Sequence, residues 1–459
     1  MKYHLVTLGC QMNISDSGRV KTYIEKLGYE STDNPHEADL LGVIACSVRQ
    51  KAIDKVYNLI AIWNRQKASR PLTTFLTGCI LPDDREKFLK TFDMVFDMRD
   101  LTKFAEMLAE HTHEGTYYPK LSREEQAYQM DYFWRLEGRQ PDKFEAFVPI
   151  QNGCDKFCTY CAVPYTRGRE VSRSSAEIVE EVKCLVNAGF KSITLLGQNV
   201  NSYGLDKKGN EINFAQLLEL IGRYGDESGK EFYVYFTSPH PRDMTDDVLY
   251  TIAKYKCLGK WIHIPIQSGD TEMLKRMNRK YDIERYRSVI HSIRTILPTA
   301  TIFTDIIVGF TGETLEEFEN TRRAVKEFKY NMAFIAMYSP RPGAKSSEWV
   351  DDVPKDEKSR RYSVLSDDLK SVSSLYTASM VGKEFRILVN GHDRLEGYLS
   401  GLTEGKIAVR FRSDNEALIG SFINVKITKS SDFSAEGEMI FFKNLKNPEN
   451  ANNANRIRQ

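Results

Sequence analysis

The chain has 459 residues, 41% hydrophobic and 11% aromatic, which predicts about three folded domains rather than a disordered chain. Its 64 Lys and Arg residues balance 63 Asp and Glu residues, so any nucleic-acid contact must use local patches. We expect no transmembrane helix, no signal peptide and a cytoplasmic compartment. Eight cysteines are too few for a disulfide framework and indicate thiols, metal ligands or catalytic groups.

Three short apolar runs alternate with helical stretches in residues 1–110, a pattern typical of a parallel α/β sheet. The runs are Tyr3–Leu8, Ala38–Ala45 and Leu72–Thr77. Each is followed closely by one cysteine, namely Cys10, Cys46 and Cys79. Because the carboxyl ends of parallel strands meet at one edge of a sheet, these thiols could meet in space. The alternative is three unrelated buried thiols. Residues 111–146 lack clear periodicity and are predicted to be a connector.

Residues 147–378 alternate strands and helices six times, which predicts a (βα)6 barrel or part-barrel. The candidate strands are Phe147–Gln151, Lys191–Gly197, Glu231–Thr237, Trp261–Gln267, Thr301–Gly309 and Asn331–Tyr338. Ser174 with Glu177, and Thr314 with Glu317, predict capping boxes that open two of the helices. Functional side chains in such a fold are expected on the loops that follow the strands.

The pattern after Gly382 changes to short strands separated by turns, which predicts a small β-barrel or sandwich over residues 379–442. Lys406, Arg410 and Arg412 alternate along one predicted strand and would share a face. They form either a stripe that faces RNA or an ordinary exposed sheet face. The Asn-rich tail 443–459 has almost no apolar content and is expected to be disordered.

The most specific pattern in the chain is Cys154-x3-Cys158-x2-Cys161 on the loop after the first strand of the predicted barrel. Thiolates are the ligands of iron–sulfur clusters, and three on one loop could reach three corners of a cube. One metal would then stay open for substrate. The alternatives are a chance cluster and a zinc loop, which would need a fourth ligand nearby.

These motifs resemble those of the radical S-adenosylmethionine methylthiotransferases over roughly residues 1–442. The three-cysteine loop, with Tyr160 before its last cysteine, resembles the wider radical S-adenosylmethionine superfamily. The terminal β segment is similar to a TRAM domain, a small barrel that binds RNA. The segments that carry the methylthiotransferase resemblance are Gly9–Asn13, Cys46–Ala52, Thr77–Cys79, Gly153–Arg173, Leu195–Gly204, His263–Gly269, Thr304–Thr314 and Tyr338–Gly343.

The departures from the family pattern, which include an extra Pro239 before His240, leave all six cysteines intact. Ile44 and Ala45 stand where the family usually has Asn-Thr, Thr311 replaces a proline, and Tyr235 replaces a common arginine. These changes could alter packing or the rim of the substrate site.

The resemblance implies two 4Fe-4S clusters and S-adenosylmethionine as cofactors. The radical cluster would be held by Cys154, Cys158 and Cys161, and the auxiliary cluster by Cys10, Cys46 and Cys79. One S-adenosylmethionine would methylate a sulfur of the auxiliary cluster. A second would be cleaved to a 5′-deoxyadenosyl radical, which removes hydrogen from carbon 2 of an adenine, and the substrate radical would take the methylthio group.

The resemblance also implies a substrate and partners. The substrate would be tRNA that carries a prenylated adenosine in the anticodon loop. An electron donor of unknown identity would be needed, and the chain is expected to act as a monomer.

Weaker predictions concern the loops around the cysteines. Four residues on one loop could hydrogen-bond S-adenosylmethionine or form an ordinary turn: Gln198, Asn199, Asn201 and Tyr203. Gln267 and Ser268 could serve the same ligand. Three arginines after the cysteine loop form either a grip on RNA phosphate or a solvated basic face: Arg167, Arg169 and Arg173. No catalytic residue is predicted beyond the cluster ligands, and Cys184 and Cys257 are expected in the core.

Two other functions stay open. The first is a methylthiotransferase that modifies an aspartate of a ribosomal protein; such enzymes usually show Pro-Lys after the first cysteine, where this chain has Gln11 and Met12. The second is a non-catalytic RNA-binding protein with structural zinc. Metal analysis separates it from an enzyme with iron–sulfur clusters.

Overall fold

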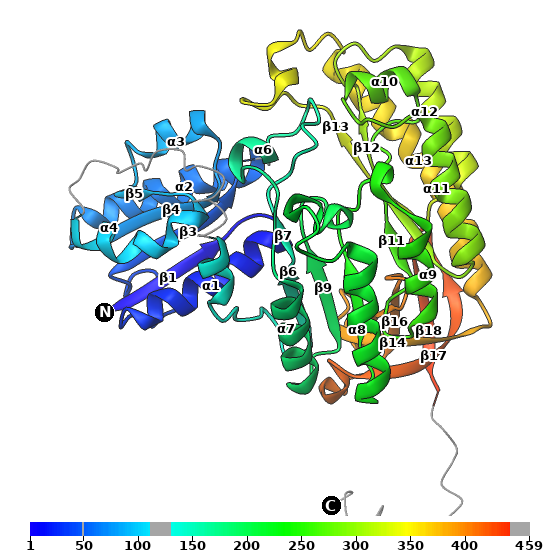
Figure 1. Cartoon of the computed structure of the whole chain (residues 1–459), viewed down its shortest axis with the longest axis horizontal. Coiled ribbons are helices and arrows are strands. Elements are labelled where there is room, and N and C mark those ends of the chain that lie inside the picture. Colours follow the sequence, from blue (N-terminus) through cyan, green and yellow to red (C-terminus); the bar gives the residue numbers. More distant parts are fainter. Residues whose placement is uncertain (48–49, 111–129, 441–459) are drawn as a thin grey trace, which may run out of the picture. The chain divides into compact units, whose positions relative to one another are not determined.

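The computed structural model describes residues 1–47, 50–110 and 130–440 (Figure 1). The chain divides into two compact units, Met1–Ser373 and Ser374–Gln459. In the described ranges, no helix is both long and apolar enough to cross a membrane.

The first unit begins with a five-stranded sheet in the order β2-β1-β3-β4-β5, and every pairing in it is parallel. The strands are β1 (Lys2–Thr7), β2 (Glu30–Ser31), β3 (Leu40–Cys46), β4 (Thr73–Cys79) and β5 (Met94–Val95). The three strands expected from the sequence are confirmed as β1, β3 and β4. The edge strands β2 and β5 were not predicted because two residues are too few to show a period.

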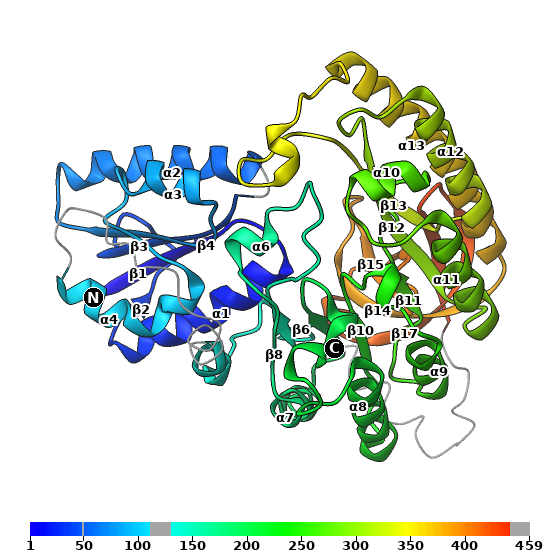
Figure 2. The same ribbon diagram turned by 45° about the horizontal axis from the view of Figure 1, so that its top comes forward.

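Helices cover both faces of this sheet (Figure 2). One face carries α1 (Gln11–Lys26), the 3-10 helix η1 (Met98–Lys103) and α4 (Phe104–Glu110), and the other carries α2 (Gln50–Lys67) and α3 (Pro82–Phe88). Met130, Phe133 and Trp134 pack into the core of the first face, so the described end of the predicted connector belongs to this core. Connector residues 111–129 lie outside the described residues.

Six strands in sequence order, paired in parallel, form the second part of the first unit, together with the short antiparallel pair of β7 (Gln151–Asn152) and β8 (Val171–Ser172). The six strands are β6 (Glu145–Pro149), β9 (Ser192–Leu196), β10 (Tyr233–Phe236), β11 (Trp261–His263), β12 (Thr301–Val308) and β13 (Met332–Met337). The first three form one sheet and the last three another, and a single bridge from Val234 to Leu258 joins β10 to the segment before β11. This is the predicted part-barrel of six βα units.

The helices of the part-barrel lie outside its strands (Figures 1 and 2). They are α7 (Ser175–Asn187), α8 (Phe214–Ser228), α9 (Asp246–Lys254), α10 (Thr271–Arg276), α11 (Ile283–Ile296), α12 (Leu315–Phe328) and α13 (Lys355–Met380), the last leading into the second unit. Thr314 and Glu317 form the predicted capping box of α12. The capping box predicted at Ser174 is wrong, because among the described residues its side chain makes no cap hydrogen bond. The first N–H of the helix, that of Ser175, donates to the Glu211 carboxylate at 3.1 Å.

The second unit contains a closed barrel in the order β14-β15-β16-β18-β17. Its strands are β14 (Glu384–His392), β15 (Tyr398–Thr403), β16 (Ala408–Arg412), β17 (Phe422–Ser430) and β18 (Ser434–Met439). Alternate residues such as Val409 and Phe411 are fully buried, as expected for strands that close around a core. The small barrel is thus confirmed, while the predicted disordered tail 443–459 lies outside the described residues.

Candidate functional site

The C-x3-C-x2-C cysteines lie between β7 (Gln151–Asn152) and α6 (Val163–Thr166), directly after the first barrel strand. Cys154 and Cys158 are buried, and the Cys161 N–H donates to the Cys158 carbonyl at 2.9 Å. Burial raises the pKa of the Cys154 thiol to about 11. Burial, together with the neighbouring Cys158, raises the pKa of Cys161 to about 12. The thiols of Cys154 and Cys161 therefore hold their protons at neutral pH, and a metal must displace those protons when it binds.

The backbone of this cysteine loop is tightly held. Gly153 has φ +80°, and a Cβ there would lie 2.0 Å from the Arg169 carbonyl oxygen, so only glycine fits. The Thr159 N–H donates to the Met277 carbonyl at 3.1 Å, and the Asn278 amide donates to the Phe157 carbonyl at 2.8 Å. The loop is thus fixed against the segment that follows α10.

A buried guanidinium lies against this loop. Arg279 is 6% exposed, and its Nη1 donates to Cys158 Sγ at 3.2 Å and to the Tyr160 hydroxyl at 3.1 Å. Its Nε donates to the Tyr281 hydroxyl at 3.2 Å. A cation in this position stabilises negative charge on the cysteine sulfur.

The other three predicted ligands meet at the carboxyl edge of the five-stranded sheet. Cys46 and Cys79 end the neighbouring strands β3 and β4 and are paired in register. Cys10 is the N-cap of α1, and its Sγ lies 3.5 Å from Asn13 Oδ1. The same Asn13 oxygen lies 3.7 Å from Cys79 Sγ. A hydrogen bond with Cys46 and burial raise the pKa of Cys79. Cys79 thus links the set, since it lies against the Asn13 amide that Cys10 also contacts and against Cys46.

Each set offers three thiols, the donor type of an iron–sulfur cluster, and two of the three in each set are buried. In the described part of the chain, no three His, Cys, Asp or Glu side chains form a site for a single metal ion. Cys184 and Cys257 take no part in either set. Cys257 is buried as predicted, but Cys184 is exposed at the solvent side of α7, so the prediction that it packs in the core is wrong.

A buried polar cluster surrounds the Ser202 hydroxyl, beside the radical cysteine loop. The hydroxyl donates to Glu170 Oε1 at 2.6 Å and accepts from Asn199 Nδ2 at 2.7 Å and from Gln151 Nε2 at 3.2 Å. Among the described residues, three buried oxygens of this cluster have no hydrogen-bond partner: Gln151 Oε1, Glu170 Oε2 and Asn199 Oδ1. The same is true of Gln198 Oε1, next to Asn199 in the chain. Unpaired buried acceptors are costly, which indicates that they await a donor from a ligand.

Glu170 was missed by the sequence analysis. Burial raises its pKa to about 7, although the Ser202 hydrogen bond opposes this. Near it, Lys156 Nζ and Asp243 Oδ2 form an ion pair at 2.5 Å. The available signal was an acidic residue directly after the arginine-rich segment, but a lone glutamate carries no spacing pattern.

Three of the other predicted ligand residues, Asn201, Tyr203 and Ser268, already hydrogen-bond within the protein. Asn201 exchanges two hydrogen bonds with the backbone of His240, and the Tyr203 hydroxyl donates to the Arg173 carbonyl at 2.6 Å. Ser268 Oγ lies 3.2 Å from Thr321 Oγ1. Gln267 is 8% exposed with φ +68° on the loop after β11. Asn201, Tyr203 and Ser268 therefore shape the loops, while Gln198 and Asn199 offer free acceptors.

The three arginines after the cysteine loop do not form one basic face. Arg167 and Arg173 are buried at 7% and 5% exposure, which corrects the prediction that they grip RNA phosphate. Arg173 pairs with Glu181. Arg169 is half exposed, makes a two-pronged contact with the Asp155 carboxylate at 2.7 and 3.1 Å, and lies 5.4 Å from the Phe157 ring centre. Among the three, only Arg169 keeps a surface position that could meet RNA.

In the second unit, Arg410 and Arg412 share the exposed face of β16, as predicted. Arg410 also binds the Glu436 carboxylate at 2.8 Å and lies 5.7 Å from the Tyr398 ring centre. Lys406 precedes the strand in a turn, with φ +59°, rather than lying on the strand itself. The predicted stripe therefore consists of two strand residues and one turn residue.

A three-cysteine loop at the carboxyl end of the first strand of a six-stranded part-barrel defines a radical S-adenosylmethionine protein. The family model of the radical SAM superfamily matches residues 148–325. Residues 2–98 match the uncharacterized protein family UPF0004, and residues 378–440 match the TRAM domain.

Relatives that match nearly the whole chain show to which family of radical S-adenosylmethionine proteins it belongs. The chain is 39% identical over 446 residues, covering 96% of this chain and 97% of the relative, to the tRNA-2-methylthio-N(6)-dimethylallyladenosine synthase of Clostridium botulinum strain Langeland. It is 36% identical over 454 residues to the synthase of the same name from Acetivibrio thermocellus, covering 95% and 91% of the two chains. The chain belongs to the family of these synthases, the radical S-adenosylmethionine methylthiotransferases.

Solved structures support the fold alone. The radical S-adenosylmethionine methyltransferase TsrM from Kitasatospora setae matches with a TM-score of 0.55 at 13% identity, covering 75% of this chain and 73% of that one. The cobalamin-dependent radical enzyme OxsB matches with a TM-score of 0.51 at 14% identity, covering 79% and 56%.

Proposed function

We propose that this chain transfers a methylthio group to carbon 2 of N6-dimethylallyladenosine beside the anticodon of tRNA. The similarity to synthases named for this nucleoside covers nearly the whole chain. The structural observation that carries the proposal is the approach of the two cysteine sets. Arg167, from the segment that follows the radical cysteine loop, donates a hydrogen bond to Cys79 of the auxiliary set at 2.9 Å.

We propose that each cysteine set holds a 4Fe-4S cluster. When bound, the clusters would supply the electron that cleaves S-adenosylmethionine and the sulfur that is transferred. The chain buries two of the three thiols in each set, and Arg279 and Arg167 place one guanidinium on a sulfur of each set. Burial keeps water away from a site where a carbon radical is formed.

The polar cluster around Ser202 is the proposed site for the amino-acid part of S-adenosylmethionine. The ammonium group of S-adenosylmethionine is a strong hydrogen-bond donor. Glu170, Gln198 and Asn199 offer oxygens that have no partner among the described residues. A bound ammonium would also favour the ionised form of Glu170. Gln267 is proposed to contact the same ligand from the loop after β11.

The substrate must present carbon 2 of an adenine, which a base within a stem cannot do. A loop base can be turned out of its stack. Its dimethylallyl group would contribute roughly 2–3 kcal/mol by apolar burial. We propose that Arg169, Lys406, Arg410 and Arg412 contact the RNA backbone. We further propose a cytoplasmic monomer that accepts electrons from a separate donor.

A competition assay tests the substrate. The reconstituted enzyme is given prenylated and unprenylated anticodon stem-loops together with ribosomal protein, and the products are measured by mass spectrometry. We expect the prenylated RNA to be modified at least about 10-fold faster, since loss of 2 kcal/mol of transition-state binding costs more than a factor of ten. Equal turnover of the two RNAs would remove the prenyl requirement. Modification of the protein alone would assign the chain to the ribosomal-protein methylthiotransferases.

Metal analysis tests the remaining alternative. The proposal requires iron and sulfide in the purified protein. A colourless protein that contains zinc and no iron would instead support a non-catalytic RNA-binding protein.

A further inference from the structure

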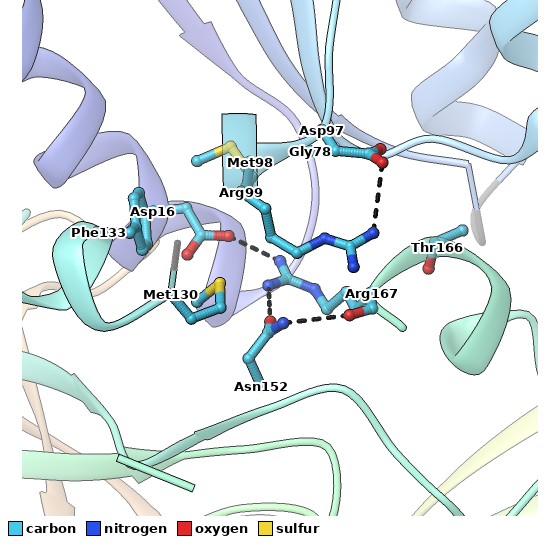
Figure 3. A pocket seen from close by; sticks show the side chains of 10 residues that line it. All are labelled: Asp16, Gly78, Asp97, Met98, Arg99, Met130, Phe133, Asn152, Thr166 and Arg167. Carbon is cyan, nitrogen blue, oxygen red and sulfur yellow. Dashed lines mark hydrogen bonds and ion pairs between the residues drawn. The ribbon is translucent and has the colours of Figure 1, made fainter. Parts of the chain in front are cut away.

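The guanidinium of Arg167 lies between the two cysteine sets of the first unit. Arg167 directly follows α6, six residues beyond Cys161, and is 7% exposed. Figure 3 shows its side chain extended between Asp16 and Asn152. Such burial of an arginine is rare unless its donors are paired.

Each nitrogen of this guanidinium has a partner. Nη2 donates to Asp16 Oδ2 at 2.7 Å and to Asn13 Oδ1 at 3.3 Å, both on α1. Nη1 donates to Asn152 Oδ1 at 3.0 Å. Nε donates to Cys79 Sγ at 2.9 Å. One side chain thus binds the auxiliary cysteine edge with two nitrogens and the start of the radical cysteine loop with the third.

The contact with the radical loop is reciprocal. Asn152 stands two residues before Cys154, and its Nδ2 donates back to the Arg167 carbonyl at 3.2 Å. Asn13 is equally tied to the auxiliary edge, because its Nδ2 donates to the Ala45 carbonyl at 2.9 Å, next to Cys46. A shift of either cysteine set would therefore break hydrogen bonds at Arg167.

The charges around Arg167 also favour a role as a hydrogen-bond donor to Cys79 Sγ. Asp16 is 3% exposed and neutralises the buried guanidinium, so the ion pair as a whole carries little net charge. What remains at Cys79 is a directed N–H donor. Hydrogen bonds to ligand sulfurs stabilise the more negative oxidation state of a cluster and raise its reduction potential.

We propose that Arg167 is a positioning residue for the auxiliary site: it fixes Cys79 relative to the radical cysteine loop and raises the reduction potential of the auxiliary cluster. The proposal rests on the proposed function for its catalytic consequence, the coupling of S-adenosylmethionine cleavage to sulfur transfer. Its structural part needs only that a cluster binds at Cys10, Cys46 and Cys79.

The first experiment measures the auxiliary cluster alone. Cys154, Cys158 and Cys161 are replaced by Ala in the full chain, and the protein is reconstituted anaerobically. Arg167→Gln is then compared with its parent by iron content and by a redox titration followed by electron paramagnetic resonance. We expect about four irons per chain in the parent, and a lower midpoint potential with a changed spectrum in the variant. An unchanged potential and spectrum at full iron content would overturn the proposal.

Arg169→Gln is the matched control. Arg169 stands two positions away and also binds a carboxylate, but it is exposed and has no contact with a cysteine sulfur among its described bonds. Its substitution should leave the auxiliary potential and spectrum unchanged. An equal shift in both variants would show a general charge effect and would contradict a role for the Nε–Sγ hydrogen bond.

The second experiment measures coupling in the enzyme with both clusters. For Arg167→Gln we expect the ratio of methylthio product to S-adenosylmethionine cleaved to fall about 10- to 100-fold, as for other residues that support metal ligands. Arg167→Lys keeps the positive charge but loses the planar guanidinium with its several N–H donors. This variant tests the positioning role if Arg167→Gln does not fold. A Lys variant with parental potential and parental coupling would overturn the proposal. If the parent enzyme makes no methylthio product, the proposed function fails, while the potential of the auxiliary cluster still tests Arg167.

Discussion

At the scale of single residues, one buried guanidinium lies on one sulfur of each cysteine set. Arg279 binds Cys158, and Arg167 binds Cys79. The six cysteines could be predicted because their spacing and their positions after strands are visible in the sequence. The two arginines could not be assigned in this way, because a sequence shows the charge of a residue but not its burial. Arg167 was therefore grouped with Arg169, although their surroundings are opposite.

Replacing Arg279 should weaken the radical cluster. Arg279→Gln removes the cation and the donor at Cys158 Sγ, which disfavours the reduced cluster. We expect S-adenosylmethionine cleavage to fall about 10- to 100-fold and the radical-cluster potential to become more negative. The control is Arg287→Gln, whose exposed side chain pairs with Glu327 on the outer helices. Unchanged cleavage in Arg279→Gln would contradict this role.

Glu170 should make the stability of the metal-free protein depend on pH. Burial raises its pKa to about 7, above the ordinary value of 4.5, so the folded state favours the protonated form. The stabilisation that protonated Glu170 adds to the folded state is fully present below pH 4.5 and is lost as the pH rises through about 7. Relative to Glu170→Gln, the parent should lose up to about 3 kcal/mol of unfolding free energy over this range. Denaturant unfolding between about pH 4.5 and pH 8 measures the difference, and parallel curves would refute it.

At the scale of elements, the strands that end in cysteines position the auxiliary site. The sequence predicts β1, β3 and β4 because each is an apolar run, whereas the two-residue strands carry no period. The capping box of α12 was predicted correctly from Thr314 and Glu317. At Ser174 the same motif failed: the Ser174 side chain makes no cap hydrogen bond, and the Glu177 carboxylate pairs with Arg173 and Arg135. Local motifs predict local contacts only where no tertiary partner competes.

The end of β4 requires glycine at position 78. Gly78 has φ +114°, and a Cβ would lie 2.3 Å from the Ala45 carbonyl oxygen. Gly78→Ala should displace Cys79 and reduce bound iron from about eight to about four per chain. Gly189→Ala is the control, since Gly189 has φ +97° and no atom of the described residues lies within 4 Å of the added Cβ. Iron content near eight in Gly78→Ala would contradict this account of the strand end.

Substitution of each cysteine set should abolish a different step of the reaction. Alanine at Cys154, Cys158 and Cys161 should abolish S-adenosylmethionine cleavage, because no iron remains to pass an electron to the sulfonium. Alanine at Cys10, Cys46 and Cys79 should spare cleavage but stop methylthio transfer. Methylthio product from the second triple variant would disprove the sulfur-source role.

At the scale of the whole molecule, the barrel of the second unit should bind RNA through charge. Replacing Lys406, Arg410 and Arg412 by Gln should weaken tRNA binding and reduce the slope of log affinity against log salt by about two, through lost counterion release. Filter binding at several salt concentrations measures both. A matched control replaces Lys383, Lys426 and Lys429, which are exposed on or beside β17. Equal loss in the two variants would place no specific RNA contact on β16.

The central claim is that this chain makes the methylthio nucleoside in tRNA. Mass spectrometry of tRNA nucleosides from cells with and without the protein tests it most directly. The account predicts that 2-methylthio-N6-dimethylallyladenosine disappears without the protein, that N6-dimethylallyladenosine accumulates in its place, and that the two cysteine-triple variants fail to restore it. Unchanged levels of the methylthio nucleoside in cells that lack the protein would contradict the account.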